Sequence, residues 1–276
     1  MHVHDFLAGH APLTLSTWLD DGPKVVLQDE YLERVSALPF KELAVMVDGP
    51  KPGLEEARWN AANLAKLRAA FPTRDLILTI WTPAIRHSLR ELEAKIVELA
   101  SALGAVAIEA DAEPAGKWAK KFVVGYPSLA AAAEDAMRIM RLPGLRTEVT
   151  VFPAAFGSAA ELVKRADVLV SQNYAVATHD GVAVMADGKH GPERYPKESI
   201  QEARHRFPLQ KIVSGHAAYH QRFKTLAPDD AMRTAIKSAV GAGCNNIRFW
   251  AGKHFFRFKH SYAIEVLHEL IPYAVL

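Results

Sequence analysis

The sequence has a single cysteine, Cys244, among its 276 residues. One thiol cannot form an internal disulfide, so a disulfide-stapled scaffold is excluded, and folding in a reducing compartment is compatible with the sequence. Charge of one sign is not in excess either, because 33 Lys and Arg residues face 31 Asp and Glu residues, which gives a formal net charge of +2. No basic run stands out, and we therefore expect no nucleic-acid partner.

Long apolar segments are also missing. No run reaches the ~20 residues that a membrane-spanning helix needs, so we expect no stable membrane insertion. The opening residues, MHVHDFLAGHAPL, lack the basic and apolar regions of a secretory signal, and we expect synthesis in the cytoplasm. A Gly-rich phosphate-binding fingerprint does not follow the first β-rich segment, which argues against a doubly wound dinucleotide fold.

What the sequence does have is a regular alternation. Short β-rich segments are separated by longer segments with helical periodicity. The expected strands are 12–20, 42–49, 75–82, 105–113, 146–154, 167–175, 211–219 and 246–252. The expected helices are 28–38, 55–71, 84–103, 128–142, 158–166, 197–207, 228–241 and 261–271.

Alternating strands and helices indicate βαβ units and a parallel sheet. Eight such units in a chain of this length predict an α/β fold, a single (β/α)₈ TIM barrel spanning residues 1–276 as one domain. The longest irregular stretch is 176–196, and a loop of that length in a compact domain is often functional. Active sites of such barrels lie at the C-terminal ends of the strands, which is where we look for chemistry.

The fourth expected strand, GAVAIEADAE, carries carboxyl groups at every second position. Glu109, Asp111 and Glu113 share one face of this strand, while the other face is small and apolar. Same-face neighbours are ~6.5–7 Å apart, so we expect the carboxyls to disturb one another's protonation and at least one pKa to rise. A protonated carboxyl beside an ionised one is the arrangement that glycosidases use. The alternative is a structural carboxylate network paired with a cation such as Arg248.

Aromatic and polar side chains follow the ends of other expected strands. Sugar rings present apolar faces and hydroxyl edges, so aromatic platforms with a few polar groups suit them. Each tryptophan alone is more often a core residue, and His216 is equally well a loop histidine without a role. The candidate substrate-binding residues are Trp18, Asp20, Trp81, Gln172, Asn173, His216 and Trp250, and Tyr174 is a further candidate at the end of the sixth expected strand.

These motifs resemble glycoside hydrolase family 18, the chitinases and their relatives. GAVAIEADAE is similar to the acidic motif on the fourth strand of that family, SQNY to its Tyr-containing motif on strand six, and RFW to its strand-eight Trp. The sequence departs from the family pattern at Val106 and Glu109, where the motif has Asp, and at Ala175. Family 25 lysozymes, with an Asp-x-Glu on strand four, are similar too.

The resemblance implies a retaining glycosidase of a (β/α)₈ clan that acts on N-acetylated glycans. It implies that Glu113 is the general acid/base and that Asp111 orients the N-acetyl group or otherwise stabilises the charged intermediate. Tyr174 would hydrogen-bond the reacting centre and Trp250 would floor the sugar, with Glu109 as a further catalytic candidate. The implied substrate is peptidoglycan first and a chitin-like polymer second, in a compact, endolysin-like enzyme released by a holin-type partner.

Two alternatives stay open. The altered acids allow a carbohydrate-binding barrel that has lost catalysis. The opening HVHD has the H-x-H spacing of metal-dependent barrel hydrolases, so His2 and His4 would share a metal in a third class of protein. Further ligands at later strand ends are few, and we therefore expect no cofactor and no metal, and a monomer rather than an oligomer.

Overall fold

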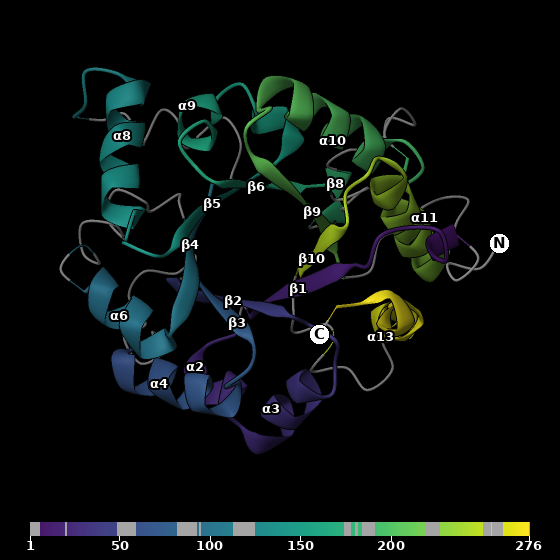
Figure 1. The fold of residues 1–276 in the computed structure, drawn as a ribbon, viewed down its shortest axis with the longest axis horizontal. Helices are drawn as coiled ribbons and strands as arrows, with labels where there is room; N and C mark the ends of the chain where they lie inside the picture. Colours follow the sequence, from purple (N-terminus) through teal and green to yellow (C-terminus); the bar gives the residue numbers. More distant parts are fainter. Residues whose placement is uncertain are drawn as a thin grey trace.

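The computed structural model describes residues 6–19, 21–48, 59–81, 93, 95–112, 125–173, 178–179, 182–183, 191–218, 227–250, 255 and 262–275. Eight parallel strands close into a barrel, in the order β1, β10, β9, β6, β5, β4, β3, β2 and back to β1 (Figure 1). The barrel strands are β1 (Thr14–Leu19), β2 (Glu42–Asp48), β3 (Asp75–Trp81), β4 (Ala105–Asp111), β5 (Arg146–Val151), β6 (Val168–Gln172), β9 (Lys211–Ala217) and β10 (Asn246–Trp250). The predicted (β/α)₈ barrel is thereby confirmed.

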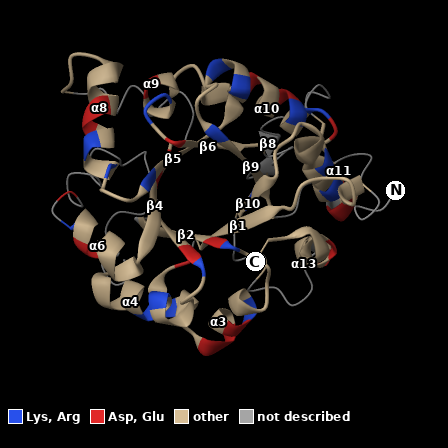
Figure 2. Ribbon diagram, in the orientation of Figure 1, with Lys and Arg blue, Asp and Glu red and all other residues tan. Residues whose placement is uncertain are grey.

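Helices surround the barrel on its outer side (Figure 1). They are α2 (Pro23–Val26), α3 (Asp29–Ser36), α4 (Ala61–Ala70), α6 (Ile96–Leu103), α8 (Leu129–Met140), α9 (Ala160–Val163), α10 (Tyr195–Arg206), α11 (Pro228–Gly241) and α13 (Tyr262–Leu270), with 3₁₀ turns η3 (Pro153–Ala155) and η4 (Ile271–Tyr273). Lys, Arg, Asp and Glu positions gather mainly on these helices (Figure 2). Within the described ranges, no helix is long and apolar enough to cross a membrane.

Predicted helix boundaries hold where a local signal fixes them. Gly104 ends α6 with φ 58°, a left-handed conformation that glycine adopts without a Cβ penalty. A Cβ there would lie 2.7 Å from the Arg68 side chain, so close packing also favours glycine. Pro228 opens α11, where its missing N–H costs nothing.

Other predicted segments differ from the structure in extent. Helix α9 is a single turn, Ala160–Val163, rather than 158–166, and α10 begins at Tyr195, inside the expected loop 176–196. Within that loop two short strands, β7 (Thr178–His179) and β8 (Val182–Ala183), pair antiparallel, so the stretch is not wholly irregular. Pairing of residues this close in the chain gives no sequence period long enough to detect.

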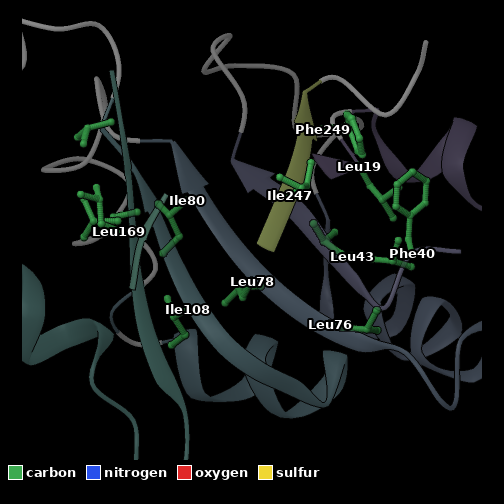
Figure 3. Packing of buried hydrophobic residues seen from close by; sticks show 14 of the residues in the cluster. Leu19, Phe40, Leu43, Leu76, Leu78, Ile80, Ile108, Leu169, Ile247 and Phe249 are labelled. Carbon is green, nitrogen blue, oxygen red and sulfur yellow. The ribbon is translucent and has the colours of Figure 1, made fainter. Parts of the chain in front are cut away.

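Each barrel strand presents one face to the helices and the other to the barrel interior. The outward face is aliphatic, and Figure 3 shows several of its side chains packed between strands and helices. On β3 this face consists of Leu76, Leu78 and Ile80, all fully buried. Burial of this continuous apolar layer is the main contribution to the stability of the fold.

The inward face is a different environment. Its apolar members are few, namely Trp18, Ala44, Ile77, Ala107, Val168, Val170 and Val213. Val106 packs against this interior cluster too, although simple alternation placed it on the outward face. The pairing of β3 with β4 shifts by one residue between Leu76 and Ile77, and this irregularity interrupts the alternation at Val106.

Candidate active site

Two clusters of polar side chains lie on opposite faces of the barrel sheet. We call the first the interior charge cluster, and its members are Glu42, Glu109, Arg146, Glu148 and Arg248. We call the second the outer amide cluster, and its members are Ser171, Asn173, Ser199, Ser214 and His216. Interior positions of such barrels are normally branched aliphatic residues, so charge there needs a specific explanation.

Glu109 lies at the centre of the barrel, with no exposed surface. Its carboxyl accepts hydrogen bonds from Trp18 Nε1 at 3.1 Å, from Thr79 Oγ1 at 2.8 Å and from the Thr150 hydroxyl. Arg248 Nη1 lies 3.2 Å from Glu109 Oε2. Four donors from four different strands therefore hold this one carboxyl in place.

Arg248 is the cation that joins the interior charge cluster. Its Nη1 donates to Glu148 Oε2 at 2.8 Å, its Nη2 to Glu42 Oε2 at 3.2 Å and its Nε to Ser16 Oγ at 3.0 Å. Arg146 completes the set, since it donates to Glu148 at 2.6 Å and to Glu42 at 2.7 Å. Three carboxyls thus share two guanidinium groups inside the barrel.

Burial and neighbouring charge compete in setting the protonation of this cluster. Burial raises the pKa of Glu109, the Arg248 guanidinium opposes that rise, and the carboxylate of Glu148 adds to it. Burial also works to raise the pKa of Glu42, but Arg248 and Arg146 outweigh it and lower that pKa. Arg248 itself loses hydration, yet the three surrounding glutamates raise its pKa and keep it charged.

Asp111 follows Glu109 on the same face of β4, one step nearer the C-terminal end of the barrel. It is fully buried and lies in register with Trp81 of β3 and Thr150 of β5. Glu109 and Asp111 therefore take the inward positions that the sequence predicted. The third acid of the series, Glu113, lies outside the described residues.

Trp18 packs against the interior charge cluster, and Trp250 packs against Trp18. The rings of Trp18 and Trp250 meet edge to face with centroids 5.2 Å apart, and Arg248 Cζ lies 5.3 Å from the centre of the Trp18 ring. Trp18 is fully buried, whereas Trp250 is half-buried. Of the two predicted aromatic residues, Trp18 therefore contacts Glu109 directly, and Trp250 packs against Trp18.

Gln172 ends β6 on the face that also carries Val168 and Val170 of the interior. Its side chain is fully buried, and neither its Oε1 nor its Nε2 has a hydrogen-bond partner among the residues that the structure describes. A buried amide without partners is costly and is rare in native proteins. The sequence predicted a substrate contact for Gln172, and that role stays a prediction.

Asn173, the next residue, belongs to the outer amide cluster. Its Oδ1 accepts from Ser171 Oγ at 2.7 Å and from the Ser199 hydroxyl, and its Nδ2 donates to Ser214 Oγ at 2.7 Å. These contacts fix Asn173 between β6, β9 and α10. The structure does not bring it together with Trp18 and Glu109.

His216 lies in the same outer cluster. Its Nε2 is 2.9 Å from Ser214 Oγ, and its ring centre is 6.5 Å from that of Phe249 in the helix-covered core. Complete burial lowers the pKa of His216 to about 3, so the imidazole is neutral at neutral pH. His216 points away from the barrel interior, because Ile212 of β9 and Ala218, the residue after β9, lie at even spacing from it and also pack outward.

The other predicted site residues fall outside what the structure describes. These are Glu113, Tyr174, Asp20 and the side chain of Trp81, together with His2 and His4 of the alternative metal hypothesis. Within the described ranges, no group of three His, Cys, Asp or Glu side chains is arranged to hold a metal ion.

Sequence reasoning missed two of the residues that contact Glu109, Thr79 and Thr150. It also missed Glu42 and Glu148, which contact Arg248, although all four residues are buried in the barrel. A signal was present in the fifth strand, where RTEVTV places Arg146, Glu148 and Thr150 at every second position. Polar residues alternating on a central strand indicate an interior polar layer, just as they do on β4.

The sequence matches no protein-family model and no curated protein. Its structure is similar to the spore cortex-lytic enzyme SleL of Bacillus cereus, with a TM-score of 0.63 and 14% identity over 94% of this chain and 75% of that chain. This fold is that of chitinase-like barrels. The catalytic domain of a Pyrococcus furiosus chitinase gives a TM-score of 0.59 and 12% identity, with 95% of each chain covered.

A third chitinase-like barrel with this fold is described as a lectin. The tamarind chitinase-like lectin has a TM-score of 0.53 and 10% identity, with 93% of this chain and 98% of that chain covered. Identities this low establish the fold alone, because one barrel fold supports many functions. The resemblance that residues 104–113 predicted is confirmed at that level.

Proposed function

We propose that this protein is a glycoside hydrolase that cleaves an N-acetylated polysaccharide, with peptidoglycan as the first candidate substrate and a chitin-like polymer as the second. The observation that carries the proposal is the line of carboxyl groups on the inward face of β4. Glu109 and Asp111 are both buried there, Glu109 accepts a hydrogen bond from Trp18, and Glu113 follows two residues after Asp111 in the sequence.

The proposed mechanism assigns a role to each of these acids. Glu113 is the general acid/base that protonates the leaving oxygen. Asp111 orients the acetamido group of the substrate or stabilises the charge that develops at the anomeric carbon. The acetamido oxygen of the substrate attacks that carbon while its bond to the protonated leaving oxygen breaks, so no protein nucleophile is needed. Water then attacks the same carbon and displaces the acetamido oxygen, and the ionised Glu113 takes the proton of that water.

The remaining residues bind the sugar in this proposal. Tyr174 hydrogen-bonds the reacting centre, Trp250 forms the floor of the site, and the unpartnered amide of Gln172 contacts a substrate polar group. Glu109, held by four donors, supports Asp111 from below rather than touching the substrate. Similarity of fold to a spore cortex-lytic enzyme and to a chitinase supports the proposed class of substrate.

Hydrolysis of purified peptidoglycan and of chitin oligosaccharides tests the proposal. Glu113→Gln should lower the rate by about 10²–10⁴-fold, the contribution of a general acid, while the fold is retained. Glu134→Gln is the matched control, since Glu134 lies on the exposed side of α8 and pairs with Arg165. Equal rates for Glu113→Gln and the control would contradict the assignment of Glu113.

A carbohydrate-binding barrel without catalysis is the second candidate. Two observations favour it: Val106 and Ala175 stand where the family motifs have Asp, and the tamarind lectin shares the fold. This candidate predicts that chitin oligosaccharides bind and are recovered intact after prolonged incubation. Release of shorter products by the wild-type protein, and its loss in Glu113→Gln, would exclude it.

A further inference from the structure

The interior charge cluster is more than a support for the barrel wall. Arg248 contacts all three glutamates of the cluster, at 3.2 Å from Glu109, 2.8 Å from Glu148 and 3.2 Å from Glu42. It has no exposed surface, so bulk water does not screen these interactions. Removal of its charge would therefore raise the pKa of Glu109 and of Glu42.

Glu109 is the member of this cluster that faces the proposed site. From the described residues of each packed element it meets Trp18 of β1, Thr79 of β3, Thr150 and Glu148 of β5, and Arg248 of β10, with Asp111 next on its own strand. The charged groups among them are Arg248, Glu148 and Asp111. Arg146 contacts Glu148 and Glu42, and Glu42 contacts Arg248.

We propose that Arg248 is a positioning residue for the site at the strand ends: it favours the carboxylate form of Glu109 and thereby influences the ionisation of Asp111, the next acid of β4, and of Glu113, which follows β4 in the sequence. The proposal rests on the glycosidase function proposed above. An ionised Glu109 repels a negative charge on its strand neighbour Asp111 and so favours the protonated forms of Asp111 and of the proposed general acid. A neutral Glu109 would relieve that repulsion.

Removal of a positive charge and removal of a negative charge near Glu109 should therefore shift its titration midpoint in opposite directions. Arg248→Met removes the cation and should move the titration of Glu109 upward by about one pH unit or more. Glu148→Gln removes the like charge and should move the same titration downward. Glu42→Gln is the matched control, because Glu42 touches Arg248 but not Glu109, and its shift should be the smallest of the three.

The indole proton of Trp18 reports this titration without any substrate. Trp18 Nε1 donates to both oxygens of Glu109, at 3.2 and 3.1 Å, so its NMR chemical shift should follow the charge of that carboxyl. Labelling tryptophan with ¹⁵N gives one indole signal for each of five tryptophans, and the signal missing in Trp18→Phe identifies Trp18. Opposite midpoint shifts in Arg248→Met and Glu148→Gln are the expected result.

The pH dependence of hydrolysis provides the second measurement. When Glu109 is neutral, the general acid loses its proton at lower pH. The alkaline limb of the pH–rate profile should therefore shift to lower pH in Arg248→Met, and it should not shift to lower pH in Glu148→Gln. If Arg248 has a purely structural role, both variants should hydrolyse more slowly, and their alkaline limbs should lie at the same pH. Arg248→Lys keeps the charge but loses the several hydrogen bonds of the guanidinium. Its alkaline limb should therefore lie at a pH between those of wild type and Arg248→Met.

Each outcome has a distinct meaning. Indole midpoints that move together, or not at all, overturn the role of Arg248 whether or not the protein hydrolyses glycans. Opposite indole midpoints without any hydrolysis by wild type leave the electrostatic role standing and contradict the proposed function. If Arg248→Met does not fold, Glu148→Gln and Arg248→Lys still decide the question, since the first must lower the indole midpoint and the second must raise it.

Discussion

The interior charge cluster, apart from the partly exposed Arg146, and the outer amide cluster both consist of buried polar groups, yet their interactions differ in kind. The interior charge cluster holds carboxyls and guanidiniums whose hydration is lost, and strong mutual attraction is needed to offset that loss. The outer amide cluster holds neutral hydroxyls, an amide and a neutral imidazole whose donors and acceptors are matched. The first is coupled to protonation and to the proposed chemistry, whereas the second joins α10 to the sheet.

Removal of Arg248 should have the largest effect on stability. Arg248→Met leaves the carboxyls of Glu42, Glu109 and Glu148 without their common cation, and loss of one partner of a buried ion pair costs about 3–5 kcal/mol of unfolding free energy. Denaturant titration at pH 7 measures this loss. Arg206→Met is the control, because its pair with Glu202 is solvent-exposed and contributes about 0–1 kcal/mol. Similar losses in both variants would contradict the distinction.

The stability deficit of Arg248→Met should also shrink at acidic pH. Without the cation the pKa of Glu109 in the folded state rises further above its unfolded value, so the folded state binds the proton more tightly and the variant gains stability as pH falls toward 5. The lowered pKa of Glu42 contributes stability above the unfolded pKa, and that contribution also weakens without Arg248. Denaturant midpoints at several pH values check this, and a deficit independent of pH would contradict it.

Truncation of Asn173 should have the next largest effect. Asn173→Ala leaves the buried hydroxyls of Ser171, Ser199 and Ser214 without their shared partner, at a cost of about 2–3 kcal/mol. The pH dependence of stability should stay as in wild type, because no charge is involved. Ser36→Ala, which removes an exposed bond to the Leu32 carbonyl, is the control and should be nearly neutral. A loss for Asn173→Ala no larger than this control would show that the cluster repacks.

His216 should make the protein less stable to acid. Because burial lowers its pKa in the folded state to about 3, the unfolded chain binds a proton that the folded protein does not. As the pH falls from about 6.5 toward the folded-state pKa of His216, the free energy of unfolding should decrease by up to about 1.4 kcal/mol per pH unit. In His216→Leu the slope of stability against pH should flatten. Phe249→Leu, which changes the neighbouring ring, is the control and should lower stability equally at every pH. If the plots of stability against pH for His216→Leu and Phe249→Leu are parallel, the role of His216 is refuted.

Replacement of Gln172 should have the smallest effect on stability. Its amide has no partner among the described residues, so Gln172→Met loses no hydrogen bond within them and should stay within about 1 kcal/mol of wild type. Its neighbour Asn173 provides the contrast, since that amide is bonded to three hydroxyls. If Gln172 contacts the sugar, the same variant should bind chitin oligosaccharides more weakly. A loss of stability as large as that of Asn173→Ala would contradict this placement.

Much of the fold could be predicted from the sequence, because hydrophobic periodicity reports which faces are buried. The alternation along β4 correctly placed Glu109 and Asp111 inside the barrel and Ile108, Ala110 and Ala112 outside. It failed at Val106, where a shift in strand register moves one side chain to the other face. Register irregularities depend on the neighbouring strand and leave no period in the strand itself.

The contacts within the site were harder to predict, because they join residues far apart in the chain. Trp18, Glu109 and Arg248 belong to three strands, and their meeting depends on closure of the barrel. His216 and Asn173 look like rim residues in the sequence, yet the alternation of β9 and β6 turns them toward the helices. If the alternation on β6 is counted from an interior residue such as Val170, Gln172 falls on the inward face and Asn173 on the outward face.

Mass spectrometry of purified peptidoglycan after incubation with the protein tests the proposed glycan cleavage most directly. Soluble fragments with new N-acetylmuramic acid or N-acetylglucosamine reducing ends are predicted for the wild type and for Glu134→Gln, and should be absent for Glu113→Gln. The identity of the reducing end would name the bond that is cut. Intact glycan after incubation with correctly folded wild-type protein, together with intact chitin oligosaccharides, would contradict the proposal.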